Sequence, residues 1–464
     1  NCTTLDTQLD GTQTRFCTDN QWDAWSTCHS SHIRENYIIV TSQDIAQHSQ
    51  ELQNFIEHKN SRGYNTQLFV ETAWLDENES GDAAAEALRR FLKDMNEEEP
   101  IKYLLIIGDP RIDTTPVPMK NLFPRNQNAV GISPHETEII CDFAAEAVPS
   151  DYMYALLSGN TDKDNDGKHA EFGQHDAATG PTGDFGPGGI DLNYKAIVGR
   201  IPVYGTYPNT LFNDSIESLD KILLKTMTYQ NATYEKHLSR LSALIAAEGE
   251  NRIFFGEAVA NDIFKKNQID PIYRVYDTEN CWYNQSCPVV LPEEPDAHIC
   301  SVGNVLVGWQ NNLPGIVTWL THGSGAGAAA VMNSYSAQIL DDDYPVITFQ
   351  ASCYNSRPST TNNLSYALLK NGAIGTVGAT AISHGPGSTV DLQDSAHFAG
   401  NAGMAYYFMK HILEDRMTNG EALVYLKMNN TLYGRCWYWQ NYVGFNLYGD
   451  PEISIYDYQA TVSE

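Results

Sequence analysis

The stretch VITFQASC (residues 346–353) carries a β-branched, apolar run that ends in two small residues and then a cysteine. The run is continuously apolar rather than alternating, which is typical of a strand covered on both faces in a parallel sheet. The stretch IVTWLTHG (316–323) has the same design and ends in His322 and a glycine. Both stretches therefore predict buried strands with a chemically active side chain at the carboxyl end.

Five more runs of this type occur along the chain, and helical patterns lie between them. The runs are YIIVT (37–41), YLLII (103–107), AIVGRIPV (196–203), LSALIAA (241–247) and AIGTVGA (373–379). Helical spacing of apolar residues is seen, for example, at Ile216, Leu219 and Leu223. Alternation of buried strands with helices predicts an α/β fold with a mostly parallel sheet.

The composition is that of a globular protein, with 42% hydrophobic and 11% aromatic residues. No apolar run reaches the roughly 18 residues that a membrane-spanning helix needs. The formal net charge of −29 opposes binding to nucleic acid or to anionic membranes, because both require basic residues. We therefore expect no membrane span and no nucleic-acid partner.

The nine cysteines indicate disulfide bonds in an oxidising compartment. No pair of CxxC motifs points to a zinc site instead. Eight cysteines can pair and leave one free, and Cys353 at its strand exit is the expected free thiol. The start at Asn1, without a signal sequence, suggests a processed product, so we expect a protein that is secreted or held at the cell surface.

The residues between His322 and Cys353 suffice for one crossover helix between two neighbouring parallel strands. Such strands end at the same edge of a sheet, where α/β proteins place their sites. An imidazole beside a thiol can generate a nucleophilic thiolate and later protonate the leaving group. Small residues such as Gly323 leave backbone N–H groups accessible to an oxyanion. A buried structural cysteine and a hydrogen-bonded histidine are the alternative.

Several spaced motifs resemble the gingipain family of cysteine endopeptidases, which belongs to the caspase–legumain group of folds. In chain order these motifs are YLLIIGDP (103–110), SDYMYALLSG (150–159), DLNYKAIVGRIPV (191–203), THGSG (321–325), FQASC (349–353) and NLYGDPEISIY (446–456). The resemblance spans about residues 36–457. It implies a caspase-like three-layer α/β/α fold with mostly parallel sheets and two subdomains.

Position by position, the resemblance implies that Cys353 is the nucleophile and His322 the general base and acid. The N–H groups of Gly323 and Cys353 would hold the oxyanion, and Asp151 in SDYMY would orient the imidazole. A helix cap or a turn is the alternative role for Asp151.

The resemblance also implies a substrate preference. Asp191 matches the position at which Arg-specific members of the family place a carboxylate in the S1 pocket, which predicts cleavage after Arg or Lys. A structural or metal-contacting role for Asp191 is the alternative. His384, at another strand exit, is expected to line the substrate cleft unless it is a plain loop histidine.

Residues 158–190 are rich in Gly, Asp and Pro and predict a long surface loop. Within it, Asp162, Asp164, Asp166 and the following glycine form the D-x-D-x-D-G start of a calcium loop, in which alternate carboxylates converge on the ion. The carbonyl of Lys168 would be a further ligand. A solvated acidic turn is the alternative.

The bidentate glutamate expected at the twelfth position of such a loop is replaced by Gly173. Three nearby carboxylates are candidates to close the site instead, namely Glu171, Asp176 and Asp184. Calcium bound there would order the loop and take no part in the chemistry.

We therefore predict a secreted, monomeric, calcium-stabilised cysteine endopeptidase that acts on proteins or peptides through a thioester and uses no organic cofactor. The predicted divisions are a Cys-containing extension (1–35), an N-terminal α/β subdomain (36–148), a catalytic subdomain (149–457) with the calcium loop at 158–190, and a tail (458–464). A sortase-like transpeptidase of the same family and a catalytically inactive calcium-binding surface module are the alternatives.

Overall fold

The computed structural model describes residues 34–76, 79–124, 130–133, 136–140, 147–172, 175–176, 180–181, 183–184, 190–279, 289–385, 400–428 and 436–458, and four short strands before residue 34. These four strands pair two by two: β1 (Cys2–Thr3) with β2 (Asp10–Gly11), and β3 (Cys17–Thr18) with β4 (Gln21–Trp22). Most of the predicted extension (1–35) and of the predicted tail (458–464) lies outside the described residues.

A ten-stranded sheet forms the centre of the fold, in the order β16-β15-β17-β21-β22-β23-β14-β7-β5-β6. In chain order its strands are β5 (Asn36–Thr41), β6 (Asn65–Val70), β7 (Ile101–Gly108), β14 (Ile197–Pro202), β15 (Ala243–Ala247), β16 (Ile272–Tyr276), β17 (Ile316–Leu320), β21 (Val346–Ala351), β22 (Ala373–Ala379) and β23 (Phe445–Gly449). Neighbouring strands are parallel except at β22 and β23, where the direction reverses. The mostly parallel α/β fold is thereby confirmed.

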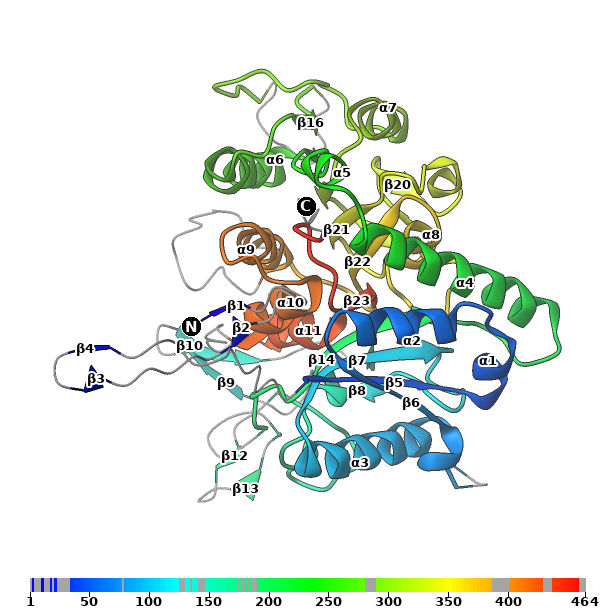
Figure 1. The fold of residues 1–464 in the computed structure, drawn as a ribbon. Coiled ribbons are helices and arrows are strands. Elements are labelled where there is room, and N and C mark those ends of the chain that lie inside the picture. Colours follow the sequence, from blue (N-terminus) through cyan, green and yellow to red (C-terminus); the bar gives the residue numbers. More distant parts are fainter. Residues whose placement is uncertain are drawn as a thin grey trace.

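Helices cover both faces of one half of the sheet (Figure 1). α2 (Leu52–Ser61) and α4 (Thr210–Gln230) pack on one face, where Phe55 and Leu219 belong to the same buried cluster as Leu105. α3 (Asp82–Glu98) packs on the other face, where Leu88 joins a cluster with Leu104. Leu104 and Leu105 are adjacent in β7, so both faces of this strand are buried.

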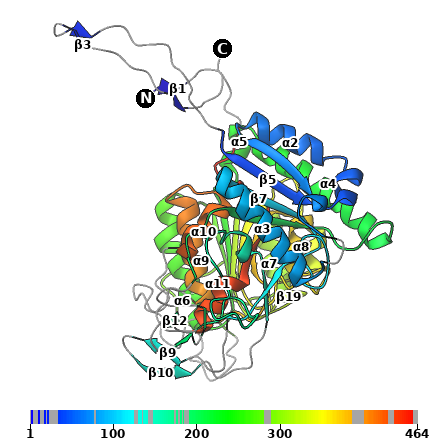
Figure 2. The same cartoon turned by 90° about the horizontal axis from the view of Figure 1, so that it is seen from below.

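The other half of the sheet is also covered on both sides (Figure 2). α6 (Glu250–Ala258), α9 (Asn401–Leu413) and α10 (Asn419–Met428) pack on one face, and α7 (Val302–Asn312) and α8 (Leu364–Lys370) on the other. These helices complete the expected three-layer α/β/α arrangement.

Smaller elements lie around this core. They are α1 (Gln43–His48), α5 (Tyr234–Leu238), α11 (Cys436–Gly444), β8 (Lys120–Leu122), β9 (Val130–Ser133), β10 (Glu136–Ile140), β11 (Val148–Ser150), β12 (His175–Asp176), β13 (Gly180–Pro181), β18 (Gly323–Ser324), β19 (Gly327–Ala328) and β20 (Met332–Asn333). β18, β19 and β20 form a small antiparallel sheet directly after β17.

The predicted subdomain boundary near residue 148 does not coincide with a break in the sheet. β14, which lies beyond that boundary, pairs in parallel with β7 from Ile197 opposite Tyr103 to Pro202 opposite Gly108. The two predicted subdomains therefore share one hydrogen-bonded sheet.

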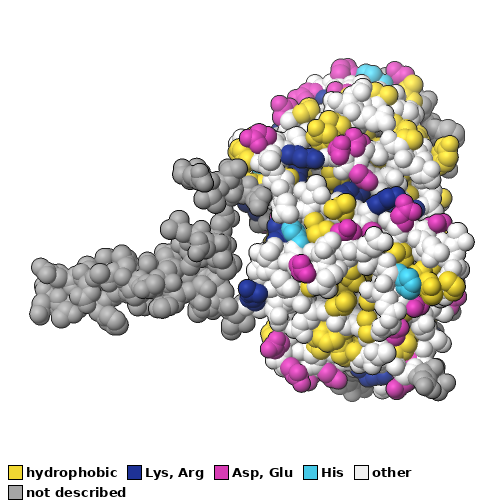
Figure 3. Space-filling view, turned by 45° about the vertical axis from the view of Figure 1, so that its right-hand side comes forward, with side chains coloured by type: hydrophobic (Ala, Val, Ile, Leu, Met, Phe, Trp, Pro, Cys, Tyr) yellow, Lys and Arg dark blue, Asp and Glu magenta, His cyan; other side chains and the backbone are white. Residues whose placement is uncertain are grey.

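The surface on the face drawn in Figure 3 carries acidic side chains throughout, with the fewer basic side chains lying among them. This face therefore has no broad basic patch. Within the described part of the chain, no helix combines the length and apolar character that crossing a membrane requires.

Candidate active site

His322 and Cys353 lie at equivalent positions beyond two neighbouring strands. β17 and β21 pair in parallel with Leu320 opposite Ala351, so each of the two side chains follows two residues after that pair. Both residues line one cavity of about 290 Å³ at the carboxyl ends of these strands. The structure thus brings the predicted nucleophile and the predicted base to one site.

The chain turns sharply at Cys353, a half-buried free thiol. The next residue, Tyr354, has a φ of +62°, which bulky side chains rarely adopt and which is typical of functional sites. The Sγ atom lies 3.4 Å from the backbone nitrogen of Ser383, whose N–H donates to it. The thiol also lies 3.5 Å from the Ser383 carbonyl oxygen, which accepts from it. No sequence motif points to Ser383.

Gly323 allows the two strand exits to approach each other closely. A Cβ atom at this position would lie 2.3 Å from the carbonyl oxygen of Cys353 and 2.8 Å from its nitrogen, so a side chain would force the two segments apart. The Asn355 side chain connects the same segments, because its amide donates to the carbonyl oxygens of Ser324 (2.9 Å) and Gly327 (3.1 Å). The close approach puts the backbone of Gly323 beside that of Cys353. The oxyanion role of their N–H groups stays a prediction.

Glu248 supplies a carboxylate to the cavity from the neighbouring strand, directly after the end of β15. Its Oε2 accepts a hydrogen bond of 2.6 Å from the hydroxyl of Thr321. Burial and the cationic Arg252 lower the pKa of His322, whereas the negative charge of Glu248 raises it. The sequence reasoning missed Glu248, although it stands at a strand exit just as His322 and Cys353 do.

Arg252, in α6, carries the positive charge of the cavity. Its Nη1 donates to the carbonyl oxygen of Glu248 at 3.1 Å, and its Nη2 donates to Nε2 of His322 at 3.0 Å. Because a guanidinium can only donate, Nε2 is the acceptor and a neutral imidazole carries its proton on Nδ1. Burial lowers the pKa of Arg252 from its usual value.

Asp151 does not lie beside His322, so its predicted role in orienting the imidazole is wrong. Its two carboxylate oxygens accept hydrogen bonds from Nε (2.7 Å) and Nη2 (2.6 Å) of Arg200, and both side chains are buried. Arg200 lies in β14, four strands from β17 in the sheet order, or roughly 19 Å at the usual strand spacing. The carboxylate of Asp151 therefore has a structural role in this buried ion pair.

Asp191 is not among the described residues that line this cavity, and its assignment to an S1 pocket stays a prediction. Its carboxylate accepts hydrogen bonds from the hydroxyl of Ser158 (2.6 Å) and the backbone N–H of Asn193 (3.0 Å), and these bonds lower its pKa. The contacts favour the structural alternative.

His384 does not line the cavity either, although both of its chain neighbours do. Its backbone N–H donates to the side chain of Asn441, which donates in return to the His384 carbonyl, both at 2.8 Å. The residues on either side of His384 therefore line the cavity, and the contribution of its side chain to a substrate cleft stays a prediction.

The predicted calcium loop brings its carboxylates together. Ligand atoms of Asp162, Asp164 and Asp166 lie within 4.8 Å of one another. The backbone N–H groups of Asp166 (3.1 Å) and Gly167 (3.0 Å) donate to the Asp162 carboxylate and fix the turn. The ammonium group of Lys168 lies 3.2 Å from the Asp166 carboxylate. An ammonium group has no lone pair for a cation, so the carbonyl oxygen of Lys168 is the ligand candidate.

Glu171 fits the closing position of this loop best among the three candidates. It is buried, and its Oε2 has no hydrogen-bond partner in the described part of the protein. Burial and the nearby Asp166 raise its pKa to about 7. Asp184 instead accepts the backbone N–H groups of Lys163 and Glu171, and the side chain of Asp176 lies outside the described residues. The other oxygen, Oε1, lies 3.9 Å from the ammonium group of Lys168. A carboxylate with one oxygen left without a partner, beside three other carboxylates, is a fit for a divalent cation.

Cys300 is a second free thiol, so the prediction of a single unpaired cysteine is wrong. It is buried, and burial raises its pKa to about 12, which keeps it protonated at neutral pH. The side chains of the other seven cysteines lie outside the described residues, and their predicted disulfide bonds stay a prediction.

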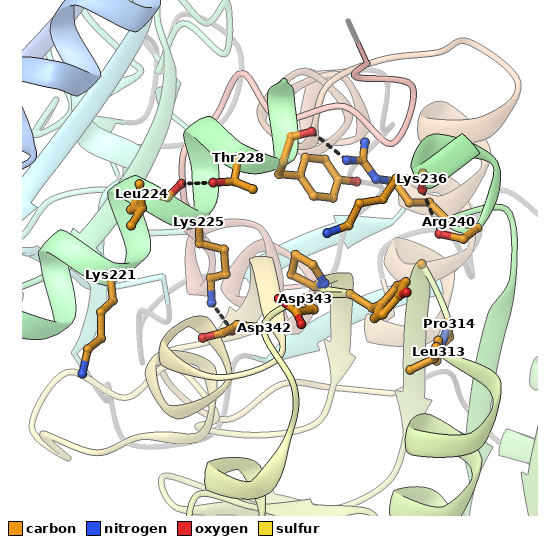
Figure 4. A pocket seen from close by; sticks show the side chains of 15 residues that line it. Lys221, Leu224, Lys225, Thr228, Lys236, Arg240, Leu313, Pro314, Asp342 and Asp343 are labelled. Atoms are coloured by element: carbon orange, nitrogen blue, oxygen red, sulfur yellow. Dashed lines mark hydrogen bonds and ion pairs between the residues drawn. The ribbon is translucent and has the colours of Figure 1, made fainter. Parts of the chain in front are cut away.

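A second cavity, of about 260 Å³, lies at the opposite edge of the sheet, before the first residues of β17 and β21 (Figure 4). Four basic side chains line it: Lys221, Lys225, Lys236 and Arg240. Lys225 pairs with Asp342 at 2.6 Å, and Arg240 donates to the carbonyl oxygen of Tyr229 at 2.6 Å. No cysteine or histidine is among its lining residues. The cavity at Cys353 is therefore the candidate active site.

Comparisons with known proteins agree with this geometry. The model of the family described as "Peptidase family C25" matches residues 31–456. The crystal structure of the Arg specific cysteine proteinase gingipain R has a similar fold, with a TM-score of 0.59 and 15% identity over 91% of this chain and 78% of that chain. A complex of the pro- and mature domains of RgpB from Porphyromonas gingivalis gives a TM-score of 0.58, with 14% identity over 90% of this chain and 79% of that one. A search of curated proteins found no match.

Proposed function

The chain belongs to peptidase family C25 and is a cysteine peptidase; from this premise we propose that it is a secreted, monomeric endopeptidase whose reaction uses Cys353 and His322. The observation that carries the proposal is the equivalent position of these two side chains beyond paired strands, in one cavity. The nine cysteines support the secreted location, because disulfide bonds persist in oxidising compartments.

In the first half of the reaction, His322 takes the proton of the Cys353 thiol, and the resulting Sγ thiolate attacks the carbonyl carbon of the scissile bond. The N–H groups of Gly323 and Cys353 stabilise the oxyanion. The C–N bond then breaks, His322 gives its proton to the leaving amine, and a thioester remains on the sulfur.

In the second half, His322 takes a proton from water as the water oxygen attacks the thioester carbonyl. The C–S bond breaks, the carboxylic acid product leaves, and His322 returns its proton to the Cys353 sulfur. Glu248 stabilises the imidazolium in both halves through its negative charge, so we assign it the positioning role that Asp151 does not fill.

The test of this proposal is incubation with a peptide library under reducing conditions, with the products identified by mass spectrometry. We expect new carboxyl termini inside the peptides, and we expect them to stop forming once Cys353 is alkylated with iodoacetamide. Absence of products, or products that persist after complete alkylation of Cys353, contradicts the proposal.

A basic P1 side chain is implied by the resemblance, and one of the similar structures is of an Arg specific proteinase. For this chain, the preference needs a carboxylate in the cavity. Asp191 is not among the described lining residues, and Glu248 is the acidic side chain among them, already bonded to Thr321. The proposal of a basic P1 therefore depends on the resemblance alone.

Replacement of Glu248 by glutamine is expected to lower kcat on the order of tenfold to a hundredfold, because the imidazolium loses its negative neighbour. Glu248 raises the pKa of His322, so its loss should move the acid limb of the kcat/KM profile to lower pH. Partial recovery in Glu248→Asp and no change in Glu294→Gln, an exposed residue, are the controls. An unmoved acid limb would show that Glu248 does not act on His322.

We also propose that the carboxylates of Asp162, Asp164, Asp166 and Glu171 hold a structural calcium ion. The convergence of the first three and the unpaired Oε2 of Glu171 support this site. The ion would replace the repulsion among four carboxylates with attraction and so order residues 158–172.

Removal of calcium with EGTA is expected to lower the thermal midpoint on the order of 3 °C, because an ion bound to the folded state alone stabilises that state. The Glu171→Gln variant should show a smaller shift on chelation, and Asp94→Asn, on the exposed side of α3, should behave as the parent protein. Equal midpoints with calcium and with EGTA would remove the calcium proposal and leave the peptidase proposal untouched.

A further inference from the structure

The active-site cavity holds one charged group that the proposed reaction does not use. Among its described lining residues, Glu248 and Arg252 are the side chains that are charged at neutral pH. Glu248 is engaged by the Thr321 hydroxyl and acts on His322. The guanidinium of Arg252 has no assigned part in bond cleavage, although it touches His322.

Arg252 has spare donors, and although the charge of Glu248 acts on it, the two side chains form no ion pair. A guanidinium carries five N–H donors, and the described contacts of Arg252 use two of them, toward the Glu248 carbonyl and toward His322. Within the described residues, no carboxylate lies within 4.0 Å of its nitrogens to form an ion pair. The remaining donors therefore stay available to a ligand in the cavity.

The position of the Arg252 guanidinium also indicates which part of a substrate it contacts. Arg252 contacts the imidazole at 3.0 Å and is close enough to Cys353 for the thiol's charge to act on it. The group nearest to both side chains during catalysis is the residue whose carbonyl is attacked, the P1 residue. A planar fork of N–H donors binds a carboxylate through two parallel bonds and repels a lysine or arginine side chain.

We propose that Arg252 is the specificity-determining residue of this peptidase and selects an aspartate or glutamate side chain at P1. This inference rests on the proposed function, since it assigns a substrate class to the same cavity. It replaces the basic P1 preference, for which the described lining residues of the cavity offer no free carboxylate.

An acidic P1 side chain would also change His322. In the described state, Arg252 donates to Nε2 of the imidazole and so occupies a lone pair that a general base needs. A substrate carboxylate that takes both arms of the guanidinium frees Nε2 and neutralises the positive charge beside it. Binding of the P1 side chain by Arg252 and release of Nε2 of His322 then occur together.

The experiment compares kcat/KM for peptides that differ only at P1, with Asp, Glu, Asn, Gln, Arg and Lys in turn. We expect the acidic peptides to exceed their amides on the order of tenfold to a hundredfold, the size of a charge-assisted bidentate contact. Arg252→Ala should remove this difference, Arg252→Lys should keep part of it, and Arg252→Glu should favour Lys and Arg at P1. Arg90→Ala, in α3 far from the cavity, is the matched control.

Each outcome separates the inference from the proposed function. A parental thermal midpoint in Arg252→Ala shows that the variant is folded. Cleavage after basic or apolar residues, or an acidic preference found only at P1′, overturns the assignment of Arg252 while the peptidase stands. Failure of every peptide, together with an unreactive Cys353, overturns the proposed function itself.

Discussion

The Cys353→Ala variant is expected to lose peptide hydrolysis by at least about a thousandfold, since no thioester forms without the sulfur. The variant should remain folded, because the cysteine is only half-buried at the end of a strand and alanine fits within its volume. Cleavage is followed by chromatography of a defined peptide, and the thermal midpoint reports the fold.

The matched control for Cys353→Ala is Cys300→Ala, which removes the other described free thiol. Cys300 is buried and its pKa is raised to about 12, so it supplies no thiolate at neutral pH. We expect Cys300→Ala to cleave the peptide at the parental rate, apart from a small loss of stability. Retained activity in Cys353→Ala, or lost activity in folded Cys300→Ala, would place the nucleophile elsewhere.

The second large effect is expected on stability. The Asp151→Asn variant leaves the buried guanidinium of Arg200 without its counterion, which typically costs about 3–5 kcal/mol of unfolding free energy. Chemical denaturation measures this cost directly. The residual activity of the folded variant should keep the pH profile of the parent, because Asp151 acts on Arg200 and not on His322.

A double replacement sharpens the test of the Asp151–Arg200 pair. Apolar side chains at both positions, as in Asp151→Leu with Arg200→Met, remove both charges and should recover much of the lost stability. If Asp151→Asn instead loses little unfolding free energy and shifts the acid limb of the pH–activity profile, Asp151 acts on the imidazole of His322. That result would contradict the contacts seen here.

The fold was predictable because continuous apolar runs identify buried strands. The stretches at 316–323 and 346–353 were predicted to contain buried strands that end before His322 and Cys353, and the structure has them as β17 (Ile316–Leu320) and β21 (Val346–Ala351). The reversal at β23 was not predictable in this way, since the apolar pattern of a buried strand is the same for either direction.

The candidate site was predictable only where the signal was local. His322 and Cys353 follow their strands directly, so the chain itself marks their positions. Asp151 was assigned by a motif, but a carboxylate's partner is a tertiary contact, and Arg200 lies 49 residues away in sequence. Glu248 carried the same strand-exit signal as His322 and was overlooked because no motif pointed to it.

The reversal of strand direction between β22 and β23 decides which loops reach the catalytic edge. The segment leading into β14 arrives at the edge where β17 and β21 end, because β14 runs parallel to β23 and opposite to β22. The Gly- and Asp-rich insert at 158–190 precedes this segment in the chain. None of the described residues 158–172 belongs to the ten-stranded sheet, so changes of sequence in this part of the insert leave the hydrogen bonds between the strands in place.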